Sequence, residues 1–298
     1  MKKAGDTIIL LEEKARKARQ YLKSCTLCPR ECRVNRLQGQ RGFCKVGERA
    51  IVSSVGPHFG EEAPLVGRQG SGTIFFSGCN LGCLFCQNYD ISHLLHGREI
   101  SEEELADQML YVQSLGCHNV NLVTPTHVVP QILGALALAR HQGLDLPIVY
   151  NCGGYESLET LRVLDGVIQI YMPDFKYGDN AVAKKYSGAE DYFDRAREAL
   201  SEMHRQVGDL VLDERGIAQR GLLIRHLVLP GGLAGTEKVM EFIAQELSPN
   251  SYVNVMAQYY PQYRANEFPE LDRRITGQEY QRAVEIAGEK GLGRLDGG

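Results

Sequence analysis

Short runs of β-branched residues alternate with longer amphipathic stretches from Thr73 onward, and this alternation limits the possible folds more than any other feature. The pattern is typical of parallel βα units rather than of a β-sandwich. We count six units and predict an α/β fold, a partial (β/α)6 barrel of the TIM type, with its active site at the carboxyl ends of the strands. The predicted strands are residues 73–77, 119–123, 147–151, 167–171, 222–229 and 252–256, and the predicted helices are residues 102–115, 129–142, 158–164, 192–207, 237–247 and 278–290.

Local signals mark some of these boundaries. Ser101 with Glu104, and Thr276 with Glu279, have the spacing of capping boxes, in which side chains bond the first free N–H groups of a helix. Residues 209–218 have the composition of a short hairpin inserted before the fifth strand.

The first 72 residues differ from the rest of the chain. They combine a charged helix around residues 12–23, four cysteines, and a segment over 56–72 that is rich in glycine and proline. We therefore predict two parts: an N-terminal helix with a four-cysteine metal-binding appendage over residues 1–72, and the barrel over residues 73–298.

Charge and hydrophobic patterning exclude several classes of partner. The chain has 33 basic and 37 acidic residues and a pI near 6.1, which removes bulk attraction to nucleic acid or to an anionic membrane. The apolar run over residues 8–11 is too short for an export signal, and prolines and polar residues interrupt the uncharged stretch over 119–139. We expect a cytoplasmic protein without a membrane or nucleic-acid partner.

Nine cysteines are unexpected in such a protein, because a reducing cytosol does not favour structural disulfides. Cys79, Cys83 and Cys86 directly follow the first predicted strand, at the functional end of the barrel. Three thiolates within eight residues can bind three irons of a [4Fe–4S] cluster and leave the fourth iron open for a substrate. A three-cysteine zinc site, or three unrelated buried thiols, are the alternatives.

This C-x3-C-x2-C loop, followed by βα units, resembles the radical S-adenosylmethionine (SAM) superfamily. Residues 70–92 are similar to uncharacterised homologues of pyruvate formate-lyase activating enzymes. The resemblance implies a [4Fe–4S] cluster on Cys79, Cys83 and Cys86, with SAM bound to the open iron. It also implies a 5′-deoxyadenosyl radical that abstracts hydrogen from a substrate, and an electron donor of the flavodoxin or ferredoxin type.

The same resemblance carries SAM-binding roles to several residues. Asp174 and Lys176 match the Asp-x-Lys pair that lies beside the methionine moiety in activating enzymes, although a plain salt bridge would also explain them. Phe85 matches the aromatic residue that contacts adenine, with an ordinary core role as the alternative. Asn88, which follows the cysteine motif, and Arg225, in the fifth predicted strand, are further candidates for the cofactor site.

Two positions depart from the activating-enzyme pattern. The usual acid after the second strand is replaced by a segment that contains Thr124, Thr126 and His127, and Asn151 replaces an acid after the third strand. His127 is a candidate ligand for SAM or substrate, or a residue that starts a helix. Asp174 is then the one matched carboxylate expected near the methionine moiety. We assign no catalytic side chain beyond these cofactor ligands.

Cys25, Cys28, Cys32 and Cys44, which we call the leader cysteines, form a second set of soft ligands. Four thiolates suit either a closed zinc site or a second iron–sulfur cluster, and reduced, empty thiols are a third possibility. A filled site would either hold the appendage together or relay electrons to the open cluster.

The sequence therefore predicts a radical SAM enzyme that abstracts hydrogen from an unidentified substrate. The resemblance favours a protein or peptide glycine, as in glycyl-radical proteins, whereas the altered residues around SAM make a small molecule the rival substrate, and the sequence does not choose between them. The alternative from another class is a non-catalytic iron–sulfur or electron-transfer protein. Reductive cleavage of SAM separates the two classes.

Overall fold

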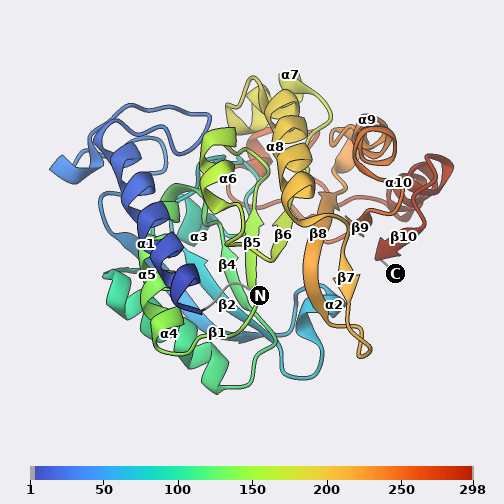
Figure 1. Cartoon of the computed structure of the whole chain (residues 1–298). Helices are drawn as coiled ribbons and strands as arrows, with labels where there is room; N and C mark the ends of the chain where they lie inside the picture. The colour runs from blue at the N-terminus through green and yellow to red at the C-terminus, as the bar shows by residue number, and fades with distance from the viewer. Residues whose placement is uncertain (1–3, 297–298) are drawn as a thin grey trace.

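The computed structural model describes residues 4–296, which form one open sheet with helices around it (Figure 1). The strand order is β10-β9-β8-β6-β5-β4-β2-β1-β3, and β7 pairs with β8 outside this path. Neighbouring strands from β2 to β10 are parallel, whereas β1 is antiparallel to both β2 and β3. The strands are β1 (Ala50–His58), β2 (Ser71–Phe76), β3 (Arg98–Ile100), β4 (Val120–Val123), β5 (Ile148–Cys152), β6 (Ile170–Pro173), β7 (Val211–Leu212), β8 (Ala218–Leu227), β9 (Tyr252–Met256) and β10 (Arg294–Asp296).

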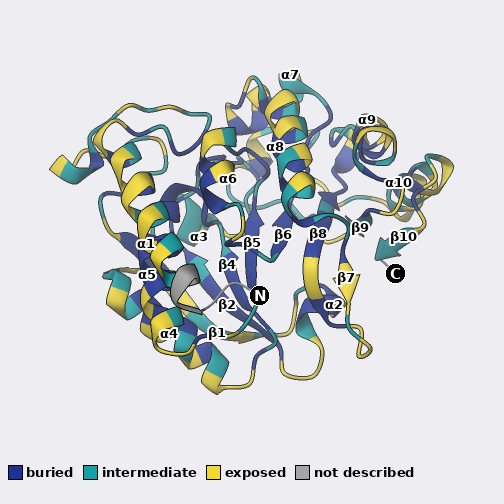
Figure 2. Ribbon diagram, in the orientation of Figure 1, coloured by how far each residue is buried: buried dark blue, intermediate teal, exposed yellow. Residues whose placement is uncertain are grey.

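Helices connect the parallel strands and cover the outside of the sheet (Figure 1). Figure 2 shows that the central strands β2, β4, β5 and β6, with the inner faces of these helices, make up most of the buried core. The α-helices are α1 (Ala4–Gln20), α2 (Ala63–Val66), α3 (Tyr89–Ser92), α4 (Glu102–Ser114), α5 (Val129–His141), α6 (Leu158–Leu164), α7 (Asn180–Ser187), α8 (Tyr192–Val207), α9 (Thr236–Phe242), which continues as a π-helix over Ile243–Leu247, and α10 (Gly277–Glu289).

The predicted fold class is confirmed, because the six predicted strands correspond to β2, β4, β5, β6, β8 and β9 of an open, mostly parallel sheet. The strand predicted over 167–171 is displaced: β6 begins only at Ile170. The preceding residues form a turn, in which the Val167 N–H bonds the carbonyl of Leu164 at 2.9 Å. The Gln169 side chain then bonds the backbone of both Ile148 and Val167, so that this segment joins two strands and is not one itself.

Both predicted capping boxes and the predicted hairpin are present. Ser101 and Thr276 each accept a hydrogen bond from the backbone of the glutamate three residues later, and that glutamate bonds back. Strands β7 and β8 form the hairpin.

The first 72 residues contribute to the same sheet as the barrel. Strand β1, which was not predicted, pairs with β2, and α1 packs against α5. Helices α1 and α4 together bury α5 on almost every side, which explains why its sequence lacks the polar face of a surface helix. The division of the chain at residue 72 stays a prediction.

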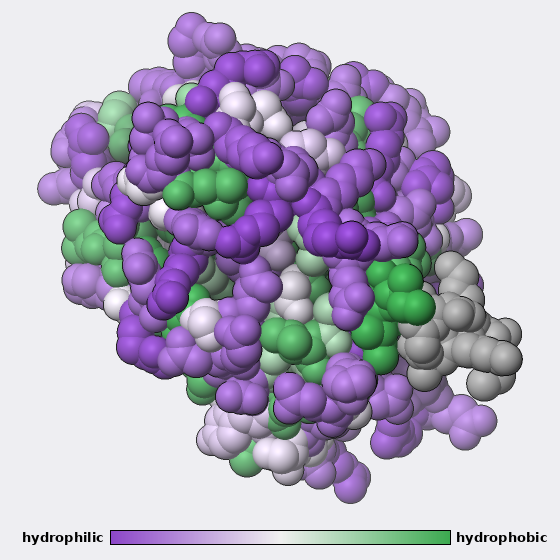
Figure 3. All heavy atoms as spheres, turned by 60° about the vertical axis from the view of Figure 1, so that its left-hand side comes forward, coloured by the Kyte–Doolittle hydropathy of each residue, from purple (hydrophilic) through white to green (hydrophobic). Residues whose placement is uncertain are grey.

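Within residues 4–296, no helix is both long enough and apolar enough to cross a membrane. Figure 3 shows one face of the molecule, where hydrophilic residues dominate and hydrophobic side chains lie in separate groups.

Candidate active site

The cysteine loop, residues 77–88, begins where β2 ends and carries Cys79, Cys83 and Cys86. Gly78 and Gly82 both have positive φ, at +84° and +67°. A Cβ atom added to Gly78 would lie 2.6 Å from the carbonyl oxygen of Cys44. Glycine is therefore needed at Gly78 for its backbone conformation and for space, and the loop is fitted closely against the leader segment.

Hydrogen-bond donors face the thiols of this loop. The Leu81 N–H lies 3.3 Å from Cys79 Sγ, and Ser92 Oγ lies 3.2 Å from Cys86 Sγ. Burial, together with the neighbouring Cys83 and Cys86, raises the pKa of Cys79 to about 12, since all three thiols lie close together. Three thiolates in this position therefore need a positive partner, which a metal cluster would supply.

A partly buried ion-pair network lies at the carboxyl ends of the next strands. Asp174, just after β6, accepts hydrogen bonds from Lys176 Nζ and Arg225 Nε, both at 2.6 Å. Arg225 also donates to Asn151 Oδ1 at 2.8 Å, which joins β5 to β8. The Lys176 charge acts on Cys86 as well. The structure thus brings the predicted residues Asn151, Asp174, Lys176 and Arg225 together beside the cysteine loop.

Opposite charges keep this network ionised. Burial would raise the pKa of Asp174, but Arg225 and Lys176 outweigh it and hold that pKa below its ordinary value. Burial would lower the pKa of Lys176 and of Arg225, but the Asp174 charge holds both above their ordinary values. The site therefore presents fixed positive and negative charges at neutral pH.

Two further carboxylates, which the sequence analysis did not predict as site residues, belong to this network. Glu61 and Glu62, just before α2, approach Arg225 Nη1 at 3.3 and 3.7 Å. Asn254 Nδ2 donates to Glu62 Oε1 at 3.0 Å, whereas Glu62 Oε2 has no partner. Burial, opposed by Arg225 and assisted by Glu62, raises the pKa of Glu61 to about 7. The only sequence signal was an acidic pair beside a helix-starting proline, Pro64.

A carboxylate outside the activating-enzyme pattern also lies near these strand ends. Glu156, on the loop after β5, is 1% exposed and accepts hydrogen bonds from Thr126 Oγ1 at 2.6 Å and from the Tyr150 hydroxyl at 3.0 Å. A different loop thus places an acid against the segment after β4. The sequence feature that could have pointed to Glu156 is the pair Gly153-Gly154, which follows a strand and ends two residues before Glu156.

Glu156 should make the stability of the protein depend on pH. Burial raises its pKa to about 7, although hydrogen bonds from Thr126, Tyr150 and Cys152 oppose the shift. An acid with a raised pKa stabilises the folded state fully below its unfolded pKa of 4.5, and this contribution is lost as the pH rises through about 7. We expect urea unfolding to show a smaller loss of stability between about pH 5 and about pH 7.5 in Glu156→Gln than in the unaltered protein. The exposed Glu159→Gln is the matched control, and equal pH dependence in all three proteins would contradict this assignment.

The remaining predicted residues lie at different depths around the site. Phe85 is buried and packs edge-to-face against Tyr177 and Tyr259, with ring centroids 6.2 and 5.8 Å apart. Asn88 is exposed and precedes α3. Thr124 has a φ of +60°, which is strained for a β-branched residue, and its N–H bonds the carbonyl of Asn151 at 2.8 Å.

His127 lies deeper than the other residues of its segment. It is 1% exposed, and its Nε2 lies 2.9 Å from the carbonyl oxygen of Ser77, at the start of the cysteine loop. Burial lowers the pKa of His127 to about 3, so that the ring is neutral and donates from Nε2. Its Nδ1 has no partner. His127 and all four leader cysteines line one cavity.

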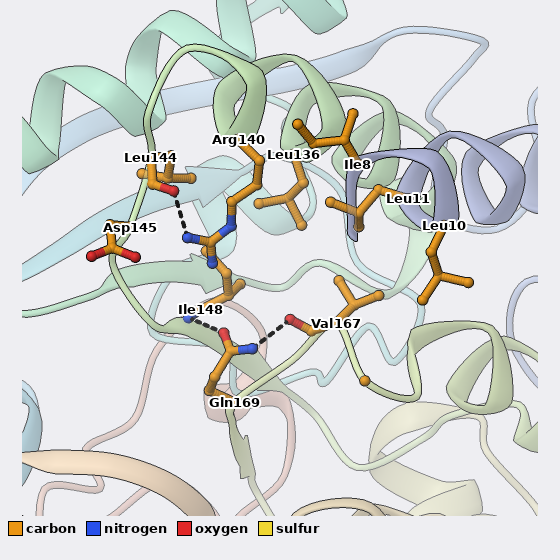
Figure 4. Close-up of a pocket in the computed structure, with 11 residues that line it drawn as sticks. Ile8, Leu10, Leu11, Leu136, Arg140, Leu144, Asp145, Ile148, Val167 and Gln169 are labelled. Carbon is orange, nitrogen blue, oxygen red and sulfur yellow. Dashed lines mark hydrogen bonds between the residues drawn. The ribbon is translucent and has the colours of Figure 1, made fainter. Parts of the chain in front are cut away.

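A separate cavity of about 270 Å³ lies at the opposite end of the sheet (Figure 4). It lies between α1, α5 and the starts of β5 and β6, and its walls are mostly aliphatic, with Arg140 bonded to the backbone at one side. It contains no thiol, and we do not assign chemistry to it.

Residues 73–214 match the family model described as the radical SAM superfamily. An uncharacterised protein of Methanocaldococcus jannaschii is 36% identical over 288 residues, which cover 93% of this chain and 78% of that protein. A second uncharacterised protein of the same organism is 27% identical over 163 residues, 47% of this chain and 46% of that protein.

The crystal structure of a radical SAM methyltransferase from Sphaerobacter thermophilus has a similar fold. The TM-score is 0.50 at 13% identity, over 76% of this chain and 65% of the methyltransferase chain. This chain therefore spans just under two thirds of that structure, and the likeness concerns the fold alone.

Proposed function

This chain belongs to the radical SAM superfamily, and we propose that it is an enzyme whose [4Fe–4S] cluster is held by Cys79, Cys83 and Cys86. When bound, such a cluster supplies the electron that cleaves SAM to methionine and a 5′-deoxyadenosyl radical, which abstracts hydrogen from a substrate. The observation that carries the proposal is the meeting of the three-thiol loop with the Asp174 network at the carboxyl ends of the strands.

The residues of the loop suit such a cluster. N–H groups face the sulfurs of Cys79 and Cys86, and Lys176 adds a positive charge close by. Donors and positive charge both favour thiolates over thiols, and thiolates are the ligands that iron requires. Three ligands leave one iron free for SAM.

The ion-pair network suits the charged end of SAM. Asp174, Asn151 and Thr126 present oxygen atoms at neighbouring strand ends, and these accept hydrogen bonds from an ammonium group. Lys176 and Arg225 can pair with a carboxylate. We therefore propose that this cluster of side chains orients the methionine moiety, and that buried Phe85 supports the adenine side of the site.

The C-terminal part of the chain covers the cysteine loop. The Arg264 N–H bonds the carbonyl of Leu84 at 2.9 Å, and Gln87 Nε2 donates to the carbonyl of Gln258 at 2.9 Å. The ring of Tyr263 stacks on His93 at 4.3 Å. This cover would exclude water and protect a reactive radical from solvent.

For the substrate, we propose only the chemical class. We propose hydrogen abstraction from either a protein glycine or a small molecule. The small molecule is favoured by Glu61 and Glu62, which make the interior below the site strongly polar. We further propose a flavodoxin- or ferredoxin-type reductant, because radical SAM enzymes generally use one.

The proposal is tested on the unaltered protein after anaerobic reconstitution with iron and sulfide. Reduction should produce the EPR signal of a [4Fe–4S]+ cluster, and adding SAM should change its shape because SAM becomes an iron ligand. 5′-Deoxyadenosine should form under the same conditions. A signal that ignores SAM, without 5′-deoxyadenosine, would favour the non-catalytic alternative.

A further inference from the structure

The four leader cysteines surround a single enclosed cavity of about 10 Å³. They come from separate turns before β1, yet the thiol of Cys44 is close enough to Cys25 and Cys32 to respond to their charges. Within residues 4–296, no three thiol, imidazole or carboxylate groups converge on a point that would hold a single metal ion. The thiols therefore encircle a space and do not meet at one point.

Each leader thiol faces an N–H group. The Phe43 N–H lies 3.3 Å from Cys32 Sγ, and the backbone N–H groups of Arg30 and Val46 bond Cys28 and Cys44. Cys25 Sγ lies 4.0 Å from Arg36 Nη1. Each of these hydrogen bonds favours the thiolate, which is the form that binds a metal, over the thiol.

Arg36 is a buried cation beside these thiols, at 1% exposure. Its guanidinium donates to the carbonyl oxygens of Gly47, at 2.7 and 2.9 Å, and of His127, at 2.7 Å. It forms no ion pair with a carboxylate in the described part of the chain. A buried charge without a counter-charge is strongly unfavourable, and a metal centre with four thiolates carries the negative charge that would balance Arg36.

We propose that Cys25, Cys28, Cys32 and Cys44 bind an iron–sulfur cluster, with Arg36 as its buried counter-charge. Zinc would draw four sulfurs to about 2.3 Å from one ion, which leaves no room for a water-sized space between them. The cavity that these thiols line has room for a water-sized group, and thiols placed around a space rather than around one point suit a cluster with several irons and sulfides between its cysteine ligands.

The cavity shares a wall with the cysteine loop. Arg30 Nε donates to the carbonyl of Asn80 at 2.9 Å, and Arg30 Nη2 to that of Leu81 at 3.0 Å. Asn80 and His127 both line the cavity. On the proposed function of the loop, one electron from a flavodoxin- or ferredoxin-type donor would reduce the leader cluster and then pass through this wall to the second cluster, which reoxidises the first.

Metal and sulfide analysis of the full chain after anaerobic reconstitution tests this proposal. In the variant with Cys79, Cys83 and Cys86 all changed to Ser, between about a third and about a half of the iron and acid-labile sulfide should remain, depending on the cluster type. Cys28→Ser with Cys44→Ser should lose that share and keep the SAM-responsive EPR signal under dithionite. Zinc in place of the remaining iron, or no metal there, would overturn the proposal. Because the triple variant lacks the loop ligands, its result stands whether or not SAM is cleaved.

Arg36 provides a second test that does not depend on the cysteine variants. In the triple variant, Arg36→Gln should lower the reduction potential of the remaining cluster, because a positive charge favours the reduced state. Arg36→Lys should restore most of the potential. Arg33→Gln is the matched control, since Arg33 lies in the same segment and pairs with Glu31 at the surface. An unchanged potential in Arg36→Gln would remove Arg36 from the proposal.

Discussion

Cys83→Ala is expected to abolish both the SAM-responsive EPR signal and the formation of 5′-deoxyadenosine. Cys83 is 6% exposed and lies in the middle of the cysteine loop, so that its loss leaves two thiolates for a cluster that needs three. The iron content should fall by the share that the loop binds, and the leader share should stay. Metal analysis and EPR of the reduced protein measure both effects.

The fold should survive this change, which separates loss of a ligand from loss of structure. Removing one buried sulfur leaves a small cavity that costs about 1–2 kcal/mol of stability. Cys117→Ala is the matched control, because Cys117 is also buried, at 2%, but lies just before β4 and outside the cysteine loop. Cys117→Ala should lose similar stability and keep the signal. A SAM-responsive signal in Cys83→Ala would show that the loop is not the site.

Local sequence patterns predicted the elements that are determined locally. The helix Leu158–Leu164, the helix Tyr192–Val207 and the strand Tyr252–Met256 have the predicted bounds, because periodicity and flanking breakers define them. Strand β1 was missed because Gly56 and Pro57 interrupt the alternation of apolar and polar residues. Its hydrogen bonds to β2 hold this segment in the strand conformation despite the weak pattern. Propensity is outweighed there by a tertiary contact.

The residues of the candidate site could be predicted where a charged or metal-binding side chain comes directly after a strand in the sequence. Asp174 and Lys176 satisfy this condition, and they form an ion pair beside the cysteine loop. Glu61 and Glu156 do not, because loops bring them in from elsewhere and no spacing rule links them to Arg225 or Thr126. The contacts of His127 with the leader cavity were likewise hidden, since they join segments about 90 residues apart, as the Arg36 contact shows.

Asp174→Asn is expected to weaken SAM binding by roughly tenfold to more than hundredfold, the loss that follows removal of a charge-assisted hydrogen bond worth about 1.5–3 kcal/mol. Both carboxylate oxygens of Asp174 already hold a cation at 2.6 Å, and an amide can accept at only one of them. The cluster should assemble normally, because no thiol is changed. SAM titration of the reduced protein, followed by EPR, gives the affinity. Asp213→Asn, in a surface pair with Arg215, is the control.

A double variant shows how Asp174 acts. Arg225 keeps Glu61 and Glu62 as partners when Asp174 is lost, whereas Lys176 has no other carboxylate partner within residues 4–296. If the affinity falls because an unpaired Lys176 repels the SAM ammonium, Asp174→Asn combined with Lys176→Met should bind SAM better than Asp174→Asn alone, although the loss of a Lys176 contact with the SAM carboxylate keeps it below the unaltered protein. If Asp174 itself binds that ammonium, the double variant should bind no better than the single one. Affinity equal to that of the unaltered protein in Asp174→Asn would exclude both roles and assign the ammonium to Thr126, Glu156 or backbone carbonyls.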